Sequence, residues 1–261
     1  QMNIPFFVPQ GRAGLTPKLS LSYSSFSSEL MSPYGYGMDL SVNSIFRVPE
    51  RGIDELYTRD DYAVKLGGKY NELTLIDVAT GTYRGKLGND FSLYQKTGNT
   101  WMVTDTTGIK YFFGDAESAR QTDPDDAAHT FQWFLTRVED THDNEIVYTY
   151  TGDQGQVYPD TIQYVNFAPG EYLYKVNFTY VPKTRFVTHY RTGFAVSTAK
   201  LLSAITIQEK SSGSWDTVRT YTITYDTLDN ALSHIQTVTE SAGGASLPPL
   251  TFTYHSLGVG V

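Results

Sequence analysis

Residues 11–47 read GRAGLTPKLSLSYSSFSSELMSPYGYGMDLSVNSIFR, and this stretch decides the fold of the chain. At 19–23, leucines and a tyrosine alternate with serines, which is the period-2 pattern of a half-buried β-strand. A polar, serine-rich loop follows at 24–33, and apolar residues recur in a second extended segment at 40–47. The pattern alone predicts two strands joined by a loop.

Between these strands, Tyr34 and Tyr36 are each followed by a glycine. Glycine is favoured where the backbone takes a positive φ angle or passes close to another segment. We therefore expect Gly35 and Gly37 to let the two tyrosines pack against neighbouring backbone. On this interpretation, a valine at either glycine position strains the backbone or overfills the site.

The composition is that of a folded, strand-rich protein. The chain has 261 residues, and 14% of them are aromatic, whereas disordered chains are poor in aromatic residues. Tyrosine alone accounts for 20 residues, and it favours strands on a half-buried surface. The length fits one large all-β domain or two smaller ones.

Charge and cysteine content exclude several classes of function. The net charge of −8 offers nothing that attracts phosphate, so nucleic acid is not an expected partner. The absence of cysteine excludes a disulfide scaffold and a cysteine metal site, but leaves the compartment open. The sequence has no run of about 18 apolar residues, so we expect no membrane segment.

One strand pattern recurs along the chain. Five segments share the order apolar-x-apolar-x-Tyr, and they lie at 19–23, 146–150, 176–180, 221–225 and 250–254. Three segments share Leu-x-x-Ile/Val, and they lie at 135–138, 202–205 and 232–235. Repetition of one strand–turn–strand unit indicates a sheet built from similar hairpins. Helical character is confined to 115–129, where Asp123 is a candidate N-cap and Pro124 a candidate first helical residue.

Two acidic clusters are candidate metal sites. The first consists of Glu139, Asp140, His142, Asp143 and Glu145. It lacks the D-x-[DN]-x-[DN]-G frame of a calcium loop, so we favour a solvated hairpin turn. The second consists of Asp115, Asp123, Asp125 and Asp126. No glycine places its carboxylates around an ion, and a weak calcium site is the alternative to a plain acidic loop.

No catalytic arrangement is recognisable in the sequence. The five histidines are scattered without zinc-site spacing, and neither a G-x-S-x-G elbow nor a phosphate loop is present. We therefore expect no enzyme activity, no catalytic, cofactor-binding or metal-binding residues, and no cofactor. The separation of paired carboxylates for glycoside hydrolysis is a property of the fold, so the sequence leaves this alternative open. It ranks last, because no Asp or Glu stands in a recognisable catalytic frame.

The order and spacing of these features resemble a known family. Residues 11–47 are similar to the opening of the N-terminal domain shared by SpvB-type virulence proteins and the B subunits of insecticidal toxin complexes (Tc toxins). That opening runs roughly G-x-G-G-L-x-P-x-L-x-L-x-Y-x-S, then G-x-G-W-x-L-S, then I-x-R. Two departures are visible: Ala13 stands where the family usually has glycine, and Met38 where it usually has tryptophan.

The second half of the chain carries the same resemblance. Residues 134–150, FLTRVEDTHDNEIVYTY, look like a divergent YD repeat of the RHS type, with Asp143-Asn144 in place of Gly-Asn. Asp tolerates a left-handed conformation better than most residues, so the turn survives this change. The segments 200–207 and 247–254 match the SpvB-type domain in order. The resemblance therefore covers essentially the whole chain.

The resemblance implies an all-β fold of antiparallel, hairpin-rich curved sheets of the RHS/YD-repeat kind, with almost no helix. It implies one SpvB-like β domain over 1–261, with signature strands at 1–50, a hairpin region at 51–130 and YD-like strand repeats at 131–261. This domain is expected to be a fragment of a much longer chain. We further expect at least one long sheet edge without a partner, and a broad curved sheet rather than a compact two-layer sandwich. The strands at 221–225 and 250–254 are the ones expected to pair onward.

For function, the resemblance implies a non-catalytic structural domain of a hollow β shell that encloses and helps deliver a C-terminal toxic polypeptide. The implied partners are the remainder of its own YD-repeat chain or a TcC-like chain, together with the encapsulated toxin polypeptide. The implied location is secreted or at the bacterial cell surface, within a larger complex. SpvB-type proteins carry ADP-ribosyltransferase activity in a separate domain with an E-x-E motif, and no E-x-E occurs here. The alternative is a carbohydrate-binding or adhesin β module, whose exposed tyrosines would stack on sugars.

Overall fold

The fold is described from a computed structural model, which covers residues 2–24, 32–50, 52–88, 90–227 and 232–254. Among these described residues, strands make up 58% and helical turns 3%. The described helical segments are two short 3₁₀ turns, η1 (Arg12–Gly14) and η2 (Glu117–Ala119). The predicted all-β, antiparallel fold with almost no helix is confirmed.

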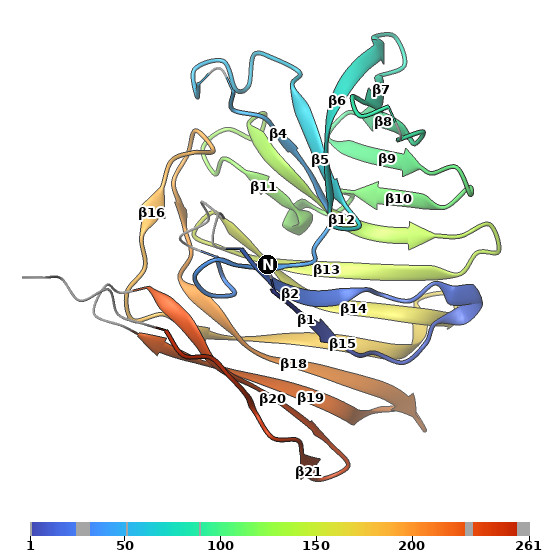
Figure 1. Cartoon of the computed structure of the whole chain (residues 1–261). Helices are drawn as coiled ribbons and strands as arrows, with labels where there is room; N and C mark the ends of the chain where they lie inside the picture. Colours follow the sequence, from blue (N-terminus) through green and yellow to red (C-terminus); the bar gives the residue numbers. More distant parts are fainter. Residues whose placement is uncertain (1, 25–31, 51, 89, 228–231, 255–261) are drawn as a thin grey trace, which may run out of the picture.

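Eight antiparallel strands close into a barrel in the first half of the chain (Figure 1). They are β4 (Ser44–Arg47), β5 (Tyr62–Leu66), β6 (Lys69–Asp77), β7 (Thr82–Gly85), β8 (Leu93–Thr97), β9 (Thr100–Thr104), β10 (Lys110–Phe113) and β12 (Thr130–Glu139). Successive strands pair as hairpins, as the glycine-containing turns after β5 and β8 predict. The barrel is filled by aromatic side chains, which include Tyr62, Trp101 and Trp133.

Strand β12 closes the barrel because its two halves pair with different strands. Its first half pairs with β4 over Gln132–Phe134, and its second half pairs with β10 from Leu135 onward. The second half also pairs with β13 (Glu145–Asp153), which begins the open sheet. Strand β12 therefore belongs both to the barrel and to the open sheet, and its backbone hydrogen bonds join the two parts.

The open sheet continues from β13 in long antiparallel hairpins. Its further strands are β14 (Gln156–Ala168), β15 (Glu171–Pro182), β18 (Lys200–Ser211), β19 (Ser214–Thr227), β20 (Ser233–Ala242), β21 (Ala245–Ser246) and β22 (Leu250–Thr251). The recurrent tyrosine-ended segments at 146–150, 176–180 and 221–225 lie in β13, β15 and β19. Of the segment at 250–254, only Leu250 and Thr251 form strand.

A second layer covers part of the open sheet. A small sheet of β1 (Met2–Phe6), β2 (Leu19–Tyr23) and β3 (Met38–Leu40) lies across it, in front of β13–β15 in Figure 1. The ring of Phe6 packs edge-on against Tyr221 of β19 with ring centroids 4.9 Å apart. The expected broad curved sheet therefore carries a second layer over part of its face, because the apolar faces of the signature strands need an apolar partner.

Within 115–129, the stretch with expected helical character, the structure has the short turn η2, and Asp123 does not begin a helical turn. Turn η2 leads directly into a strand, β11 (Arg120–Thr122), which pairs with β12. The carboxylate of Asp123 accepts a hydrogen bond from the backbone N–H of Asp125 at 3.0 Å, and the N–H of Asp123 donates to the carbonyl of His129 at 3.0 Å. Asp123 thus shapes a turn that returns the chain to β12, rather than capping a helix.

The arginine that ends the signature stretch ties a loop to the barrel. Arg47 is buried, and its guanidinium donates to the carbonyl oxygens of Thr130 at 3.0 Å, Leu56 at 3.2 Å and Arg59 at 2.7 Å. It also lies 5.0 Å from the ring centre of Tyr62. A planar, five-donor group fits such a fork of carbonyls, which explains why an arginine ends this segment.

Candidate functional site

Three tyrosines on consecutive hairpins make the same hydrogen bond. The hydroxyl of Tyr150 donates to the Leu135 carbonyl at 2.6 Å, and that of Tyr180 donates to the Pro159 carbonyl at 2.9 Å. The hydroxyl of Tyr225 donates to the Leu202 carbonyl at 2.8 Å. In each case the donor strand follows the acceptor strand in the sheet. This bond explains why both repeated patterns recur: one supplies the tyrosine, and the other supplies two of the three acceptors, Leu135 and Leu202.

A β-bulge accompanies each of these bonds. The pairing register shifts immediately before Tyr150, Tyr180 and Tyr225. A bulge leaves one residue unpaired, bends the strand and increases its twist. The tyrosine hydroxyls satisfy backbone carbonyls beside these interruptions. The tyrosine-ended segments therefore bend the sheet at corresponding positions of successive strands. Their rings pack within the sheet and are not presented to a ligand.

The signature loop docks onto this row of bulges. The backbone N–H of Tyr36 donates to the Ser233 carbonyl at 2.8 Å, and the N–H of Leu202 donates to the Pro33 carbonyl at 2.9 Å. Tyr34 is buried among the repeat tyrosines, and burial, reinforced by the negative charge of Asp39, raises its pKa well above the usual value. The loop and the repeats therefore form one structural unit, which neither segment reveals alone.

Removing one hydroxyl from this row is expected to destabilise the chain. Tyr180→Phe and Tyr225→Phe should each lower the free energy of unfolding by about 1–2 kcal/mol, because a buried carbonyl loses the hydroxyl that donates to it. Urea denaturation measures the change. Tyr190→Phe, at a hydroxyl exposed on the surface, is the matched control and should change stability by less than about 0.5 kcal/mol. Equal effects at all three positions would contradict the proposed role.

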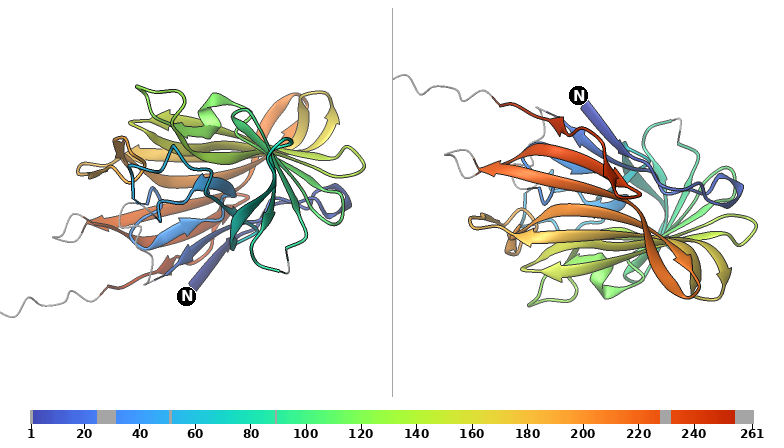
Figure 2. Two further views of the ribbon diagram at one scale, coloured as in Figure 1. Left: turned by 90° about the horizontal axis from the view of Figure 1, so that it is seen from above. Right: turned by 90° about the horizontal axis from the view of Figure 1, so that it is seen from below.

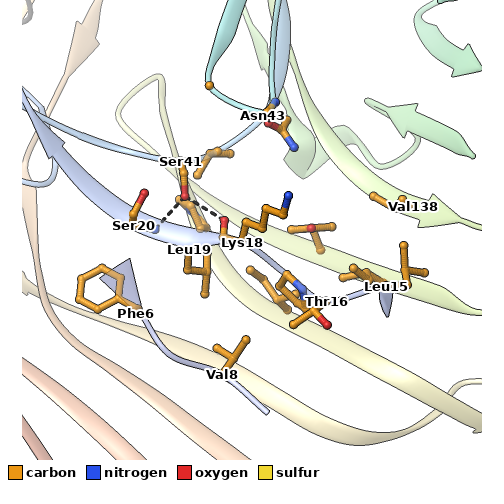
Figure 3. Close-up of a pocket in the computed structure, with 18 of the residues that line it drawn as sticks. Phe6, Val8, Leu15, Thr16, Lys18, Leu19, Ser20, Ser41, Asn43 and Val138 are labelled. Carbon is orange, nitrogen blue, oxygen red and sulfur yellow. Dashed lines mark hydrogen bonds between the residues drawn. The ribbon is translucent and has the colours of Figure 1, made fainter. Parts of the chain in front are cut away.

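An apolar cavity of about 760 Å³ lies between the small sheet and the inner face of β13–β15 (Figure 3). Phe6, Val8, Leu15 and Leu19 line one side of it. On its rim, the hydroxyl of Ser41 donates to the Lys18 carbonyl at 3.0 Å and accepts the N–H of Ser20 at 2.9 Å. Its lining residues include no His, Asp or Glu.

The two acidic clusters are structural turns. Both carboxylate oxygens of Asp140 are used within the first turn, by the backbone N–H groups of His142 and Asn144 and by the Asn144 amide. Asp143 takes a left-handed φ of 60°, as predicted from the turn chemistry. In the second cluster, His129 lies 3.8 Å from Asp123 and 3.5 Å from Asp126. The described residues contain no cluster of three or more His, Asp or Glu side chains that could hold a metal ion.

The outer edge of the open sheet is left without a strand. Within the described residues, β21 and β22 pair with β20 on one side and with no strand on the other. Leu247 and Leu250 are exposed along this edge. The prediction that 221–225 pairs onward is wrong, because this part of β19 is already paired with β20 over 220–227, and β18 pairs with β19 over 214–222. The segment from 250 onward is the one at the free edge, as expected.

None of the helical segments in the described part of the chain has the length and apolar character needed to traverse a bilayer.

Comparisons with known proteins agree with this architecture. The chain is 26% identical over 167 residues to the Mono(ADP-ribosyl)transferase SpvB of Salmonella choleraesuis and, equally, of Salmonella enteritidis. The match covers 54% of this chain but 28% of each relative, so the chain spans little more than a quarter of their length. The activity in their name therefore belongs to proteins of which this chain matches only a part.

Solved structures show the same fold. The N-terminal domain of effector protein SpvB from Salmonella typhimurium strain LT2 superposes with a TM-score of 0.78 at 19% identity, over 93% of this chain and 98% of that one. A Photorhabdus luminescens Tc holotoxin pore gives a TM-score of 0.82 at 18% identity, and a TcdB2-TccC3 complex gives 0.79 at 20% identity. Each match covers 97% of this chain, but only 15% of the matched chain in the pore and 16% of that in the complex.

The sequence family has a direct match. The family model described as "SpvB: Salmonella virulence plasmid 65kDa B protein" matches residues 1–73 and 80–184, which is more than half of the chain. The matched region contains the signature strands, the barrel and the first repeat hairpins. The chain therefore belongs to the SpvB family.

Proposed function

We propose that this chain is a non-catalytic structural domain of a toxin-complex protein, and that it forms part of a hollow β shell. In this proposal, the shell encloses a C-terminal toxic polypeptide until delivery. Its partners are the remainder of its own YD-repeat chain or a TcC-like chain. The complex acts after export from the bacterium, and the whole chain 1–261 serves as one domain of it.

The free edge beyond β20 is the observation that carries the proposal. An exposed sheet edge with apolar side chains is a template for another strand. Leu247 and Leu250 project from this edge, and a following strand from a longer chain would cover them. The shared fold with Tc toxin structures supports the same arrangement, and so does membership of the SpvB family. The bulges at the repeat tyrosines supply the curvature that a shell wall requires.

Blocking the free edge tests this role. In the protein that carries its YD-repeat continuation, Leu247→Lys with Leu250→Lys should open the wall, because charged side chains on an edge oppose strand pairing. The toxic polypeptide should resist added protease in the wild-type protein and be digested in the variant. The 261-residue chain alone should self-associate through the same edge, and the variant should weaken that association more than about tenfold.

Leu87→Lys is the matched control, because Leu87 is also exposed but lies in the barrel region. It should leave protection and association unchanged. Sedimentation velocity over a concentration series measures the association. A strictly monomeric chain whose edge amides at 245–252 are protected from hydrogen exchange would favour an independent binding module of the adhesin kind.

The proposal also excludes turnover by this chain. The cavity between the sheets is lined by no His, Asp or Glu that could serve a hydroxyl nucleophile as its base. The purified chain is expected to give no activity above background with glycosides, esters, peptides or NAD. Reproducible turnover that a single Asp or Glu substitution abolishes would refute the structural role.

A further inference from the structure

Charge is distributed unevenly along this acidic chain. The whole chain carries a net charge of −8, yet residues 172–208 contain no Asp or Glu and five Lys or Arg. Two of the five are engaged in the sheet: Lys175 lies over the Trp215 ring at 4.5 Å, and Lys200 pairs with Asp153 at 3.1 Å. The other three, Lys183, Arg185 and Arg191, lie together in the connection between β15 and β18, which we call the basic hairpin (residues 183–199).

One limb of the basic hairpin is firmly packed. It contains β17 (Val196–Ser197), and the side chains of Phe194 and Val196 are buried. The backbone N–H of Ser197 donates to the Gln154 carbonyl at 2.9 Å, and the hydroxyl of Tyr57 donates to the carbonyl of Thr192. This limb therefore fixes the hairpin against the turn between β13 and β14 and against the loop before β5.

The other limb is exposed and amphipathic. It contains β16 (Thr188–His189), and three large apolar side chains stand out from it. Their exposed fractions are 44% for Phe186, 55% for Val187 and 62% for Tyr190. Arg185 and Arg191 flank them, and within the described residues neither arginine forms an ion pair. The packed limb of the hairpin therefore preorganises an exposed surface of aromatic and aliphatic side chains between two arginines without ion pairs.

The position of this limb favours a flat partner. The basic hairpin lies at the periphery of the molecule, where β15 ends and β18 begins (Figures 1 and 2). None of its residues lines the cavity of Figure 3. A protruding, cationic and aromatic limb matches a bilayer surface, where Tyr and Phe rings enter the interface and Arg meets anionic head groups.

We propose that the exposed limb of the basic hairpin binds the surface of an anionic lipid bilayer. Arg185 and Arg191 contact the anionic head groups, and the side chains of Phe186, Val187 and Tyr190 enter the interface. The acidic remainder of the chain is repelled by such a surface, so it orients the molecule with this end toward the lipid. This inference is independent of the shell role, since it concerns a face distant in sequence from the free edge at 245–252.

Co-sedimentation of the chain with vesicles tests the proposal. Binding is expected to phosphatidylcholine vesicles that contain phosphatidylserine, not to phosphatidylcholine alone, and should fall as salt screens the charges. Arg185→Gln with Arg191→Gln should weaken binding about 25-fold, because each cation near an anionic surface contributes roughly fivefold. Phe186→Ser with Tyr190→Ser should also weaken it, while the salt dependence persists.

Matched controls come from the barrel, where Arg84 and Phe91 are also exposed. Arg84→Gln and Phe91→Ser should leave vesicle binding unchanged. Equal losses in the control variants, equal binding to both kinds of vesicle, or no binding to phosphatidylserine vesicles would each overturn the proposal. Binding to soluble poly-glutamate but not to vesicles would assign the hairpin to an acidic protein instead. Unchanged thermal unfolding of all variants confirms that the substituted surfaces remain folded.

Discussion

Replacing Trp133 by alanine is expected to lower the free energy of unfolding by about 3–5 kcal/mol, because it empties the centre of the barrel. Trp133 is buried, and its ring centre lies 5.8 Å from that of Tyr62 and 6.2 Å from that of Trp101. Its indole N–H donates to the side-chain oxygen of Asn99 at 2.8 Å. The substitution removes these ring contacts and leaves the Asn99 oxygen without this donor.

The loss should extend beyond the barrel. Because Trp133 lies on β12, which the barrel and the open sheet share, both parts should unfold in one transition. Near-UV and far-UV circular dichroism in urea should therefore give coincident curves, shifted together in the variant. Trp215→Ala, at a half-buried ring packed on Lys175, is the control and should cost less than about 1 kcal/mol. Two separate transitions, of which only one is shifted, would show that β12 does not couple the two parts.

The second large effect is expected at the glycines of the signature stretch. Gly35 has a φ of +104°, and a Cβ there would lie 3.1 Å from Cε1 of Tyr225 and 3.2 Å from the Ser233 carbonyl oxygen. Gly37 has a φ of +68°, and a Cβ there would lie 2.8 Å from Cε2 of Tyr23. Gly35→Val and Gly37→Val should each lower the free energy of unfolding by about 1–3 kcal/mol, through strain and overpacking.

Thermal unfolding measures the effect, and Gly152→Val provides the comparison. Gly152 lies in β13 with no positive φ, and its added Cβ would meet no atom within 4 Å. Since valine favours strands, this control should be neutral or slightly stabilising. An unchanged melting temperature in both Gly35→Val and Gly37→Val would mean that the loop does not depend on its contact with the row of bulges.

Local patterns in the sequence predicted much of the strand content. Alternation at 19–23 and at the tyrosine-ended segments is a property of consecutive residues, so it identifies strands without knowledge of their partners. The positive φ at Gly35 and Gly37 likewise followed from residue type. The left-handed Asp143 followed from its place in the turn. The resemblance to the SpvB family joined these local features, and the family match confirms it.

Such local patterns could not predict that the barrel closes. It depends on β4 pairing with Gln132–Phe134 of β12, which lies more than 80 residues away. Neither segment specifies this partner, because the alternation of each fits many antiparallel neighbours. The same limit explains the wrong edge: β20 lacks a terminal tyrosine, so it was not recognised as the strand that covers β19.

The tyrosine–carbonyl bonds were not predicted, and the short helical turn expected at Asp123 is not formed, for different reasons. The bonds join a side chain to a carbonyl on another strand, and the acceptor at Pro159 has no distinctive neighbours in sequence. The short helical turn was predicted from Asp123 and Pro124, whose preferences for a helix start and for a turn are nearly the same. The backbone bond from Asp123 to His129 settles the choice in favour of the turn.

The aligned bulges concentrate the bending of the open sheet along one line that runs across its strands. Each hairpin crosses that line at Tyr150, Tyr180 or Tyr225, and each adds its own increment of bend there. Adding or deleting a whole hairpin makes the curved sheet wider or narrower but keeps the bulges in one line. Inserting a single residue before one of these tyrosines would shift one bulge out of line with the others. It would also move the side chains that follow the insertion to the opposite face of the sheet. Variation in the size of such a wall is therefore expected to occur in units of two strands.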